Sequence, residues 1–517
     1  MPRKHGSRTL KTRALYAITG ITVCVLLAAL VFFAVRHLPE PAAPLPGQQT
    51  ENGRQLRRRL LEQGIFKPFT GDIDAIRRRK VLRMLVPYNR TDYFLDGAAQ
   101  RGLAYDTGTA FAGWLNKRLG LTGTRRISLL FIPAAPDDML RMLREGQGDM
   151  IGYECLVPGT LPDDVTAAGP WSRTAQVVVV SRQSVPPLQS LAELSGKTVY
   201  VLKNSAVAQI LDATARTMTT TGIPVRGMAV EGGLTQEDLL DMVSGGSIAF
   251  AAAEADKAAL WARVLPDLQV HANAPLTTNA TRAWLLRSDT PQLNTLCNEF
   301  IRQYRRTTDY AWLRQKYFSR TTYVADGGRS QELARLEATL PLFIKYGEQY
   351  DFAPLLLAAQ GYQESRLNQQ ARSHKGAVGI MQLLPATAAA SPVGITDIST
   401  PENNIHAGVK YLAHLRDTYF DSEGINYLDR MLLSFAAYNA GPGNIRKARR
   451  ATAQMELNPD VWRNNVEKGV AATIGQEPVR YVRNIITYYI VFQLVREHRH
   501  IRDAALQQLD IAPHFTR

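Results

Sequence analysis

The sequence predicts a multidomain protein with a transmembrane helix, an α/β domain and a mainly α-helical domain, in that order. An apolar run without charge extends from Ala14 to Val35, and short apolar strands alternate with helical segments from Lys80 to Ser319. Helical runs with glycine-rich turns follow to the C-terminus. With 517 residues the chain has room for two sizeable cores. We expect a tail, a membrane anchor, a linker and two domains, bounded at 1–13, 14–35, 36–79, 80–319 and 320–517.

The run from Ala14 to Val35 is long enough, at about 1.5 Å per residue, to cross a hydrocarbon core of about 30 Å. Five basic residues precede it and only Arg36 closely follows, so the positive-inside rule keeps the N-terminus cytoplasmic. A cleaved signal peptide is the alternative, but the run is long for one and no small-x-small site follows it. Cys24 lies in the run without a lipoprotein-type setting.

The segment after the apolar run is expected to be a linker. Four prolines between Pro39 and Pro46 favour an extended chain. The basic stretch from Arg54 to Arg59 either lies against anionic headgroups or forms a solvated charged helix.

From Lys80 onward, alternating strands and helices predict an α/β domain with a parallel sheet. The expected strands are 81–86, 127–132, 150–152, 177–181 and 197–202, and the expected helices are 107–119, 137–145, 207–217 and 290–318.

One acidic residue closes an apolar helical run in the C-terminal third of the chain. Leu355, Leu356, Ala359 and Tyr362 mark a helix with one buried face, and Glu364 lies at its C-terminal end. The negative pole of the helix dipole and partial burial should raise the pKa of this carboxyl. A carboxyl that keeps its proton near neutral pH suits general acid catalysis. A solvated glutamate at a helix end is the alternative.

Polar and glycine-rich segments follow Glu364. Gly379 allows close backbone approach, Met381 offers a soft apolar surface, and Gln382 offers an amide donor and acceptor. An amide-bearing sugar can use all three features.

Two later segments are also polar where helices end or begin. Tyr438 and Asn439 stand where a helix gives way to a Gly-Pro-Gly turn, and residues 477–482 open a last long helix with Pro478 in its first turn.

Together these segments resemble the family 1 lytic transglycosylases, goose-lysozyme-like enzymes that cleave peptidoglycan, over roughly the last third of the chain. The resemblance implies a lysozyme-like domain in which Glu364 is the sole catalytic acid and base. It also implies that the N-acetylmuramyl unit is bound, or the acid held in place, by Ser373, Met381, Gln382, Tyr438, Asn439, Glu477 and Tyr481. Leu384 stands where relatives often have methionine, which bears on sugar packing rather than on the chemistry.

A glycoside hydrolase of the usual kind needs a second carboxylate. Glu348 and Asp351 precede Glu364 by more than three turns of helix, and Glu477 fits a structural role. The resemblance implies that Glu364 alone protonates the oxygen between N-acetylmuramate and N-acetylglucosamine, with the 2-acetamido group stabilising C1. Glu364 then accepts the proton of the muramyl C6 hydroxyl, which attacks C1 and leaves a 1,6-anhydro end.

The segment from Lys80 to Ser319 resembles the bacterial family 3 solute-binding proteins. The resemblance rests on Gly148-Asp149-Met150, on the stretch 196–199 and on the closing stretch 310–318. It implies a two-lobed, periplasmic-binding-protein-like domain.

The ligand of this domain is expected to be a muropeptide or peptide from the wall, with an empty structural lobe as the alternative. Amino-acid-binding relatives hold the ligand carboxylate by an arginine in a turn where this chain has the acidic segment 160–164, which argues against free amino acids. Arg173 is the candidate for a ligand carboxylate and Glu254 for a ligand ammonium. For each, a surface ion pair or a solvated side chain is the alternative.

This order of domains behind an anchor resembles the membrane-bound lytic murein transglycosylases of the F type. The resemblance implies a single-pass protein of the bacterial inner membrane, with peptidoglycan glycan strands as substrate and the catalytic domain in the periplasm. Closure of the two lobes on a ligand would then gate or position the catalytic site.

Composition agrees with this placement. The net charge of +15 favours anionic wall polymer or lipid headgroups, and export argues against nucleic acid as a partner. Cys155 and Cys297 form one disulfide or remain two buried thiols. No cofactor and no metal is expected, because ligand spacing is missing at His374, His406 and His414.

Two other functions stay open. A true lysozyme-type hydrolase on the same fold would give reducing ends instead of anhydro ends. A wall-binding sensor would keep the catalytic fold without turnover, but the intact Glu364 and its neighbours count against it.

Overall fold

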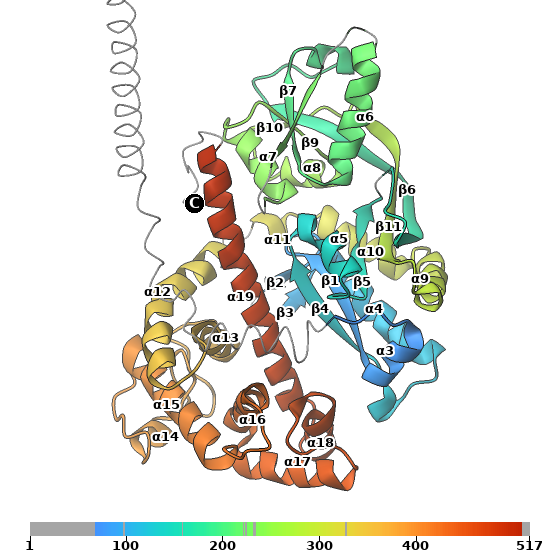
Figure 1. The fold of residues 1–517 in the computed structure, drawn as a ribbon. Coiled ribbons are helices and arrows are strands. Elements are labelled where there is room, and N and C mark those ends of the chain that lie inside the picture. The colour runs from blue at the N-terminus through green and yellow to red at the C-terminus, as the bar shows by residue number, and fades with distance from the viewer. Residues whose placement is uncertain are drawn as a thin grey trace, which may run out of the picture. The chain divides into compact units, whose positions relative to one another are not determined.

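The structure, a computed structural model, describes residues 68–96, 99–157, 159–220, 222, 225–230, 234–325 and 328–508. The predicted tail, the predicted membrane span and most of the predicted linker lie outside these ranges. Within them, no helix combines the length and the apolar character that a membrane crossing requires. The described chain forms an α/β region followed by a helical region (Figure 1).

A mixed sheet is the frame of the α/β region. Its strand order is β4-β1-β5-β11-β6-β9-β7-β8, with β10 paired to β6, while β2 and β3 form a separate pair. The strands are β1 (Val81–Pro87), β2 (Phe94–Asp96), β3 (Ala99–Arg101), β4 (Ser128–Ala134), β5 (Met150–Leu156), β6 (Val165–Arg182), β7 (Thr198–Leu202), β8 (Arg226–Val230), β9 (Phe250–Glu254), β10 (Leu268–Val270) and β11 (Thr277–Arg287).

The long antiparallel strands β6 and β11 join two lobes. Toward one end β11 pairs with β5, which continues into the parallel strands β1 and β4. Toward the other end β6 pairs with β9, which continues into the parallel strands β7 and β8. The two-lobed α/β fold is therefore confirmed. A purely parallel sheet is wrong, because the chain crosses between the lobes on two extended antiparallel strands.

Eight helices of the described chain flank this sheet. They are α3 (Ile73–Arg79), α4 (Leu103–Arg118), α5 (Pro136–Arg144), α6 (Ala206–Thr220), α7 (Gln236–Ser244), α8 (Ala255–Trp261), α9 (Pro291–Tyr304) and α10 (Thr308–Phe318). The stretch 290–318, expected to be helical, forms two helices, because the Thr307 hydroxyl accepts a hydrogen bond from Tyr310 N at 3.2 Å and caps the start of the second helix.

The two cysteines of this region are separate thiols. Cys297 lies in a core with Trp284 and Phe300, and Cys155 lies in another core with Leu285. Burial raises the pKa of both thiols. Of the two alternatives for these residues, two buried thiols is the correct one.

A buried ion pair joins the starts of two central strands. Asp149 accepts a hydrogen bond from Arg83 N at 2.7 Å, and its other oxygen lies 2.9 Å from the Arg83 guanidinium. Arg79, at the end of α3, adds a contact at 2.5 Å. Asp149, which directly precedes β5, therefore ties α3, β1 and β5 together.

The helical region packs around one large core. Its helices are α11 (Thr322–Ala325), α12 (Gly328–Gln349), α13 (Pro354–Ser365), α14 (Pro385–Ala389), α15 (Pro401–Tyr419), α16 (Tyr427–Ala440), α17 (Pro442–Gln454), α18 (Glu467–Thr473) and α19 (Glu477–Gln508). The expected mainly α-helical domain is confirmed. Glu348 lies near the end of α12 and Asp351 in the break between α12 and α13, so neither is on the helix that carries Glu364.

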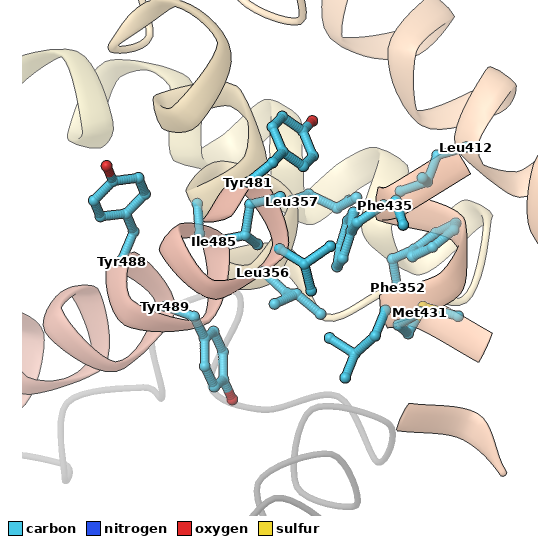
Figure 2. Close-up of a cluster of buried hydrophobic side chains, with 14 of the residues drawn as sticks. Phe352, Leu356, Leu357, Leu412, Met431, Phe435, Tyr481, Ile485, Tyr488 and Tyr489 are labelled. Atoms are coloured by element: carbon cyan, nitrogen blue, oxygen red, sulfur yellow. The ribbon is translucent and has the colours of Figure 1, made fainter. Parts of the chain in front are cut away.

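Helix α13 lies in the middle of this core. Pro354 occupies its first position, where a fixed φ favours helix entry, and Arg366 with φ 57° ends it. Leu356 and Leu357 pack in the same cluster as Tyr481 and Ile485 of α19 (Figure 2). The packing of α13 on α19 fixes where the end of α13 lies.

We predict that Asp149→Ala lowers the free energy of unfolding of the α/β region by about 3–5 kcal/mol, because Arg83 would remain buried without its carboxylate. Asp164→Ala is the control: its pair with Arg144 is half exposed and should contribute no more than about 1 kcal/mol. Denaturant unfolding followed by tryptophan fluorescence measures both. Equal losses in the two variants would show that the buried pair has no special role.

Candidate active site

Glu364 lies in the last turn of α13, partly buried. The Tyr481 hydroxyl of α19 donates a hydrogen bond to Glu364 Oε1 at 2.5 Å. The Tyr438 hydroxyl of α16 donates to the Met381 carbonyl at 2.8 Å. Burial, together with the nearby Glu364 charge, raises the pKa of both tyrosines well above the ordinary value. Three helices and one loop therefore meet at a single carboxyl.

The Glu364 carboxyl has a strongly perturbed pKa. Burial raises the pKa to about 7, and the hydrogen bond from Tyr481 lowers it in part. The predicted direction is confirmed, and burial is the main cause. Within the described residues, no second carboxylate contributes to this shift.

The loop that follows α13 depends on one glycine. Gly379 has φ +79°, and a Cβ there would lie 2.3 Å from Asn404 Nδ2. The fully buried Asn404 accepts from Met381 N at 2.8 Å and donates to the Val378 carbonyl at 3.0 Å. Asn404 therefore holds the loop from inside, which requires glycine at 379.

Gln382 and Met381 shape the loop rather than present free groups. Gln382 has φ 46°, and its Nε2 donates to the carbonyls of Ala371 at 3.1 Å and Gly379 at 2.9 Å. The Met381 side chain is fully buried in the core. The expectation that this side chain offers an apolar surface to a sugar is therefore wrong, because core packing takes it out of reach. Its backbone carbonyl instead positions Tyr438.

Three other predicted residues are exposed, one in a loop and two at helix ends. Ser373 accepts from Ala377 N at 3.0 Å in a turn of the loop after α13. Asn439 lies near the end of α16, and Glu477 begins α19 one turn before Tyr481. Their roles in sugar binding stay predictions.

Sequence reasoning missed two buried polar residues of the site. Gln360 precedes Glu364 by one turn of α13, and its Nε2 lies 3.4 Å from the Tyr481 hydroxyl. Asn404 is the other, on α15. The signal for both was an amide side chain on the apolar face of a helix.

A second candidate site lies in the α/β region. A cavity of about 150 Å³ is lined by apolar side chains, by the starts of α5, α6 and α7, and by Glu254 and Lys257. Arg173 is exposed on β6 and is not among the lining residues. The two residues predicted to bind a ligand together are therefore not brought together by this cavity.

The Glu254 carboxylate already has cationic partners. Its oxygens lie 2.7 Å from the Arg282 guanidinium and 3.2 Å from Lys257 Nζ, and Lys257 also contacts Asp92 at 3.0 Å. Although burial lowers the pKa of Lys257, Asp92 and Glu254 raise it overall. The ammonium group that Glu254 contacts therefore belongs to this chain's own Lys257.

Comparison with known proteins gives three kinds of similarity. Residues 341–460 match the family described as Transglycosylase SLT domain. The chain is 27% identical over 435 residues to a membrane-bound lytic murein transglycosylase F from Desulfosudis oleivorans, covering 81% of this chain and 91% of that one. It is 28% identical over 469 residues to the protein of the same name from Vibrio cholerae, covering 85% of each.

Among solved structures, the chain aligns with an amino acid ABC transporter substrate-binding protein, AbpA, from Streptococcus pneumoniae bound to L-arginine. The alignment has a TM-score of 0.40 and 16% identity, and covers 48% of this chain and 98% of that one. The assignment of two lobes rests on the strand order described above.

We predict that the Glu364 carboxyl titrates near pH 7 and that Tyr481→Phe raises its pKa by about one unit, because the hydrogen bond that favours the ionised form is lost. Carbon-13 NMR of glutamate-labelled protein measures the titration, and Glu364→Gln assigns the resonance. Tyr427→Phe, which removes a hydroxyl bonded to the Asp351 carbonyl, should leave the pKa unchanged. An unchanged pKa in Tyr481→Phe would contradict the prediction.

Proposed function

We propose that this chain, whose residues 341–460 match the transglycosylase SLT domain and whose similar curated proteins are named lytic murein transglycosylases, is a peptidoglycan lytic transglycosylase. The observation that carries the proposal is the Glu364 carboxyl, which has a pKa of about 7, a neutral tyrosine as its hydrogen-bonding partner, and no second carboxylate among the described residues that shifts its pKa. A carboxyl whose pKa is near 7 is present in both protonation states in neutral solution. It can therefore serve as acid and as base in one turnover.

In the first step, protonated Glu364 gives its proton to the oxygen that joins N-acetylmuramate to N-acetylglucosamine, and the C1–O bond breaks. The substrate's own 2-acetamido group stabilises the positive charge at C1. In the second step the muramyl C6 hydroxyl attacks C1, and ionised Glu364 accepts the hydroxyl proton. The product ends in 1,6-anhydro-N-acetylmuramate, and Glu364 returns to its protonated state.

The residues around Glu364 have two roles, positioning the acid and the loop and binding the sugar. Tyr481 holds one oxygen of the acid, and Tyr438 holds the loop at the Met381 carbonyl. Gln382 shapes the same loop through its side-chain amide. The exposed residues that we assign to sugar binding are Ser373, Asn439 and Glu477.

A lysozyme-type hydrolase is the second candidate on this fold. It would need a carboxylate placed to hold water or to attack C1. In the described chain only burial and Tyr481 shift the pKa of Glu364, which favours the transglycosylase.

We place the enzyme at the bacterial inner membrane. The relatives are named membrane-bound, and the apolar run from Ala14 to Val35 is long enough for one crossing. With five basic residues before the run, the N-terminus would be cytoplasmic and the domains 80–319 and 320–517 periplasmic.

We also propose that the cavity of the α/β region takes a wall peptide and that closure of the lobes on it changes the catalytic rate. The lining is mainly apolar, and Glu254 is paired with Lys257, so Glu254 is not free for the ammonium group of an amino acid. A peptide offers amides and apolar side chains instead of relying on one ammonium contact.

We predict that the protein releases anhydromuramyl products from purified peptidoglycan and that Glu364→Gln reduces release at least about 100-fold, because the proton donor is lost. Mass spectrometry of the soluble muropeptides is the measurement, since anhydro ends are lighter than reducing ends by one water.

Glu332→Gln is the matched control for this prediction. Glu332 accepts a hydrogen bond from the Tyr362 hydroxyl at 2.7 Å, and glutamine can keep that bond, so release should stay near the wild-type rate. Reducing ends that depend on Glu364 would identify a hydrolase. Release that is absent from the wild type would favour a wall-binding sensor.

We predict that a synthetic wall stem tetrapeptide changes the rate of product release by about fivefold or more. Ala206→Phe, which places a ring in the cavity at the start of α6, should abolish the change, whereas Gln209→Phe on the exposed side of α6 should keep it. Titration of the peptide against the rate is the measurement. A peptide that binds without changing the rate would remove the gating role.

A further inference from the structure

Gln360 is a polar side chain in the core of the helical region. It follows Leu356, Leu357, Ala358 and Ala359 on α13, all of them buried, and it is itself fully buried. Burying an amide is costly unless its groups are hydrogen-bonded. A leucine or methionine would fill this position without that cost, so the amide requires a physical reason.

Among the described residues, the one polar contact of the Gln360 side chain leads to Glu364 through Tyr481. Its Nε2 lies 3.4 Å from the Tyr481 hydroxyl, and that hydroxyl donates to Glu364 Oε1 at 2.5 Å. Gln360 and Glu364 are four residues apart on one face of α13, so both can reach the same side chain of α19. The three groups form a chain of hydrogen bonds that ends at the carboxyl.

The direction of this chain follows from what each group can do. A tyrosine hydroxyl has one hydrogen to donate and two lone pairs, and an amide nitrogen only donates. With Nε2 on one lone pair of Tyr481, the hydroxyl hydrogen cannot point toward that nitrogen. Glu364 Oε1 is then the acceptor that remains at hydrogen-bond distance.

The amide oxygen of Gln360 supports the interpretation that its nitrogen is kept for the contact with Tyr481. Gln360 Oε1 is buried and has no hydrogen-bond partner among the described atoms. Such an acceptor costs about 1–3 kcal/mol, and exceptions of this kind call for an explanation. Donation to Tyr481 is the contact that would be lost if an apolar residue replaced Gln360.

We propose that Gln360 is a positioning residue for the catalytic acid: by donating to the Tyr481 hydroxyl, it keeps the tyrosine hydrogen on Glu364 Oε1 and thereby places the labile proton of Glu364 on Oε2. One oxygen then always accepts from Tyr481, whether Glu364 is ionised or neutral. The other oxygen gives and takes the proton in both steps of the reaction. The kinetic part of this inference rests on the proposed function, whereas the titration part does not.

The test is a double-mutant cycle on the full chain with Gln360→Met, Tyr481→Phe and the double variant. Without Gln360 the Tyr481 hydroxyl is free to turn and accept from Glu364, which stabilises the neutral carboxyl. We expect Gln360→Met to raise the pKa of Glu364 by about half a unit in carbon-13 NMR. The alkaline limb of the pH–rate profile should move to higher pH by the same amount. In the Tyr481→Phe background, Gln360→Met should change neither the pKa of Glu364 nor the position of the alkaline limb.

Leu356→Met on the same helix is the matched control for packing, because Leu356 is buried in the core and makes no polar contact with Tyr481. It should leave the pKa and the pH–rate profile unchanged. Removal of an unsatisfied acceptor offsets part of the cost of the substitution at 360, so Gln360→Met should fold, and Gln360→Leu is a second apolar variant with the same expectation.

Two outcomes overturn the inference. In one, Gln360→Met lowers the rate at all pH values and leaves the pKa in place, which means that Gln360 only packs. In the other, Gln360→Met shifts the pKa equally with and without the Tyr481 hydroxyl. Failure of the proposed function is distinguishable, because peptidoglycan would then yield no anhydro products while the NMR cycle still reports on Gln360, Tyr481 and Glu364.

Discussion

The hydrogen bond from Tyr481 to Glu364 is the interaction on which the candidate active site depends. It joins residues 117 positions apart in the chain, and it forms only because α13 packs against α19 in the core of the helical region. Figure 2 shows Tyr481 in the same cluster as Leu356, Leu357 and Ile485. The hydrophobic packing that makes the domain stable is therefore also what sets the chemistry of the acid.

Buried carboxyl groups have different partners in the α/β region and in the helical region. In the α/β region, buried carboxylates such as Asp149 and Glu254 have guanidinium or ammonium partners, and pairing offsets their desolvation. Glu364 has a neutral phenol as its hydrogen-bonding partner, so burial dominates and the pKa rises to about 7. A cation beside Glu364 would hold it ionised and remove the acid. No cation of the described residues shifts the pKa of Glu364, so the carboxyl keeps a proton that it can transfer.

Several elements were predictable because they depend on local pattern. The apolar run that ends at Glu364 predicted α13, and its periodicity placed the acid at the C-terminal end, where the structure has it. The alternation of strands and helices predicted the α/β class, but not the long crossing strands β6 and β11. The stretch before Val177 is partly polar, so the sequence pattern did not predict that β6 begins at Val165. Long-range pairing with β11 makes this stretch a strand in spite of its weak local preference.

By itself, the sequence determined the two kinds of domain and their order, since these follow from periodicity and from turn residues. Its resemblance to the lytic transglycosylases singled out Glu364 as the candidate acid. Tertiary structure alone decided which groups surround that acid. It buried Met381, assigned the Gln382 amide to the loop backbone, and brought Gln360 and Tyr481 to Glu364. The physical reason is that a pKa and a hydrogen-bond direction depend on burial and on partners from distant segments, and neither is encoded by any single stretch of the chain.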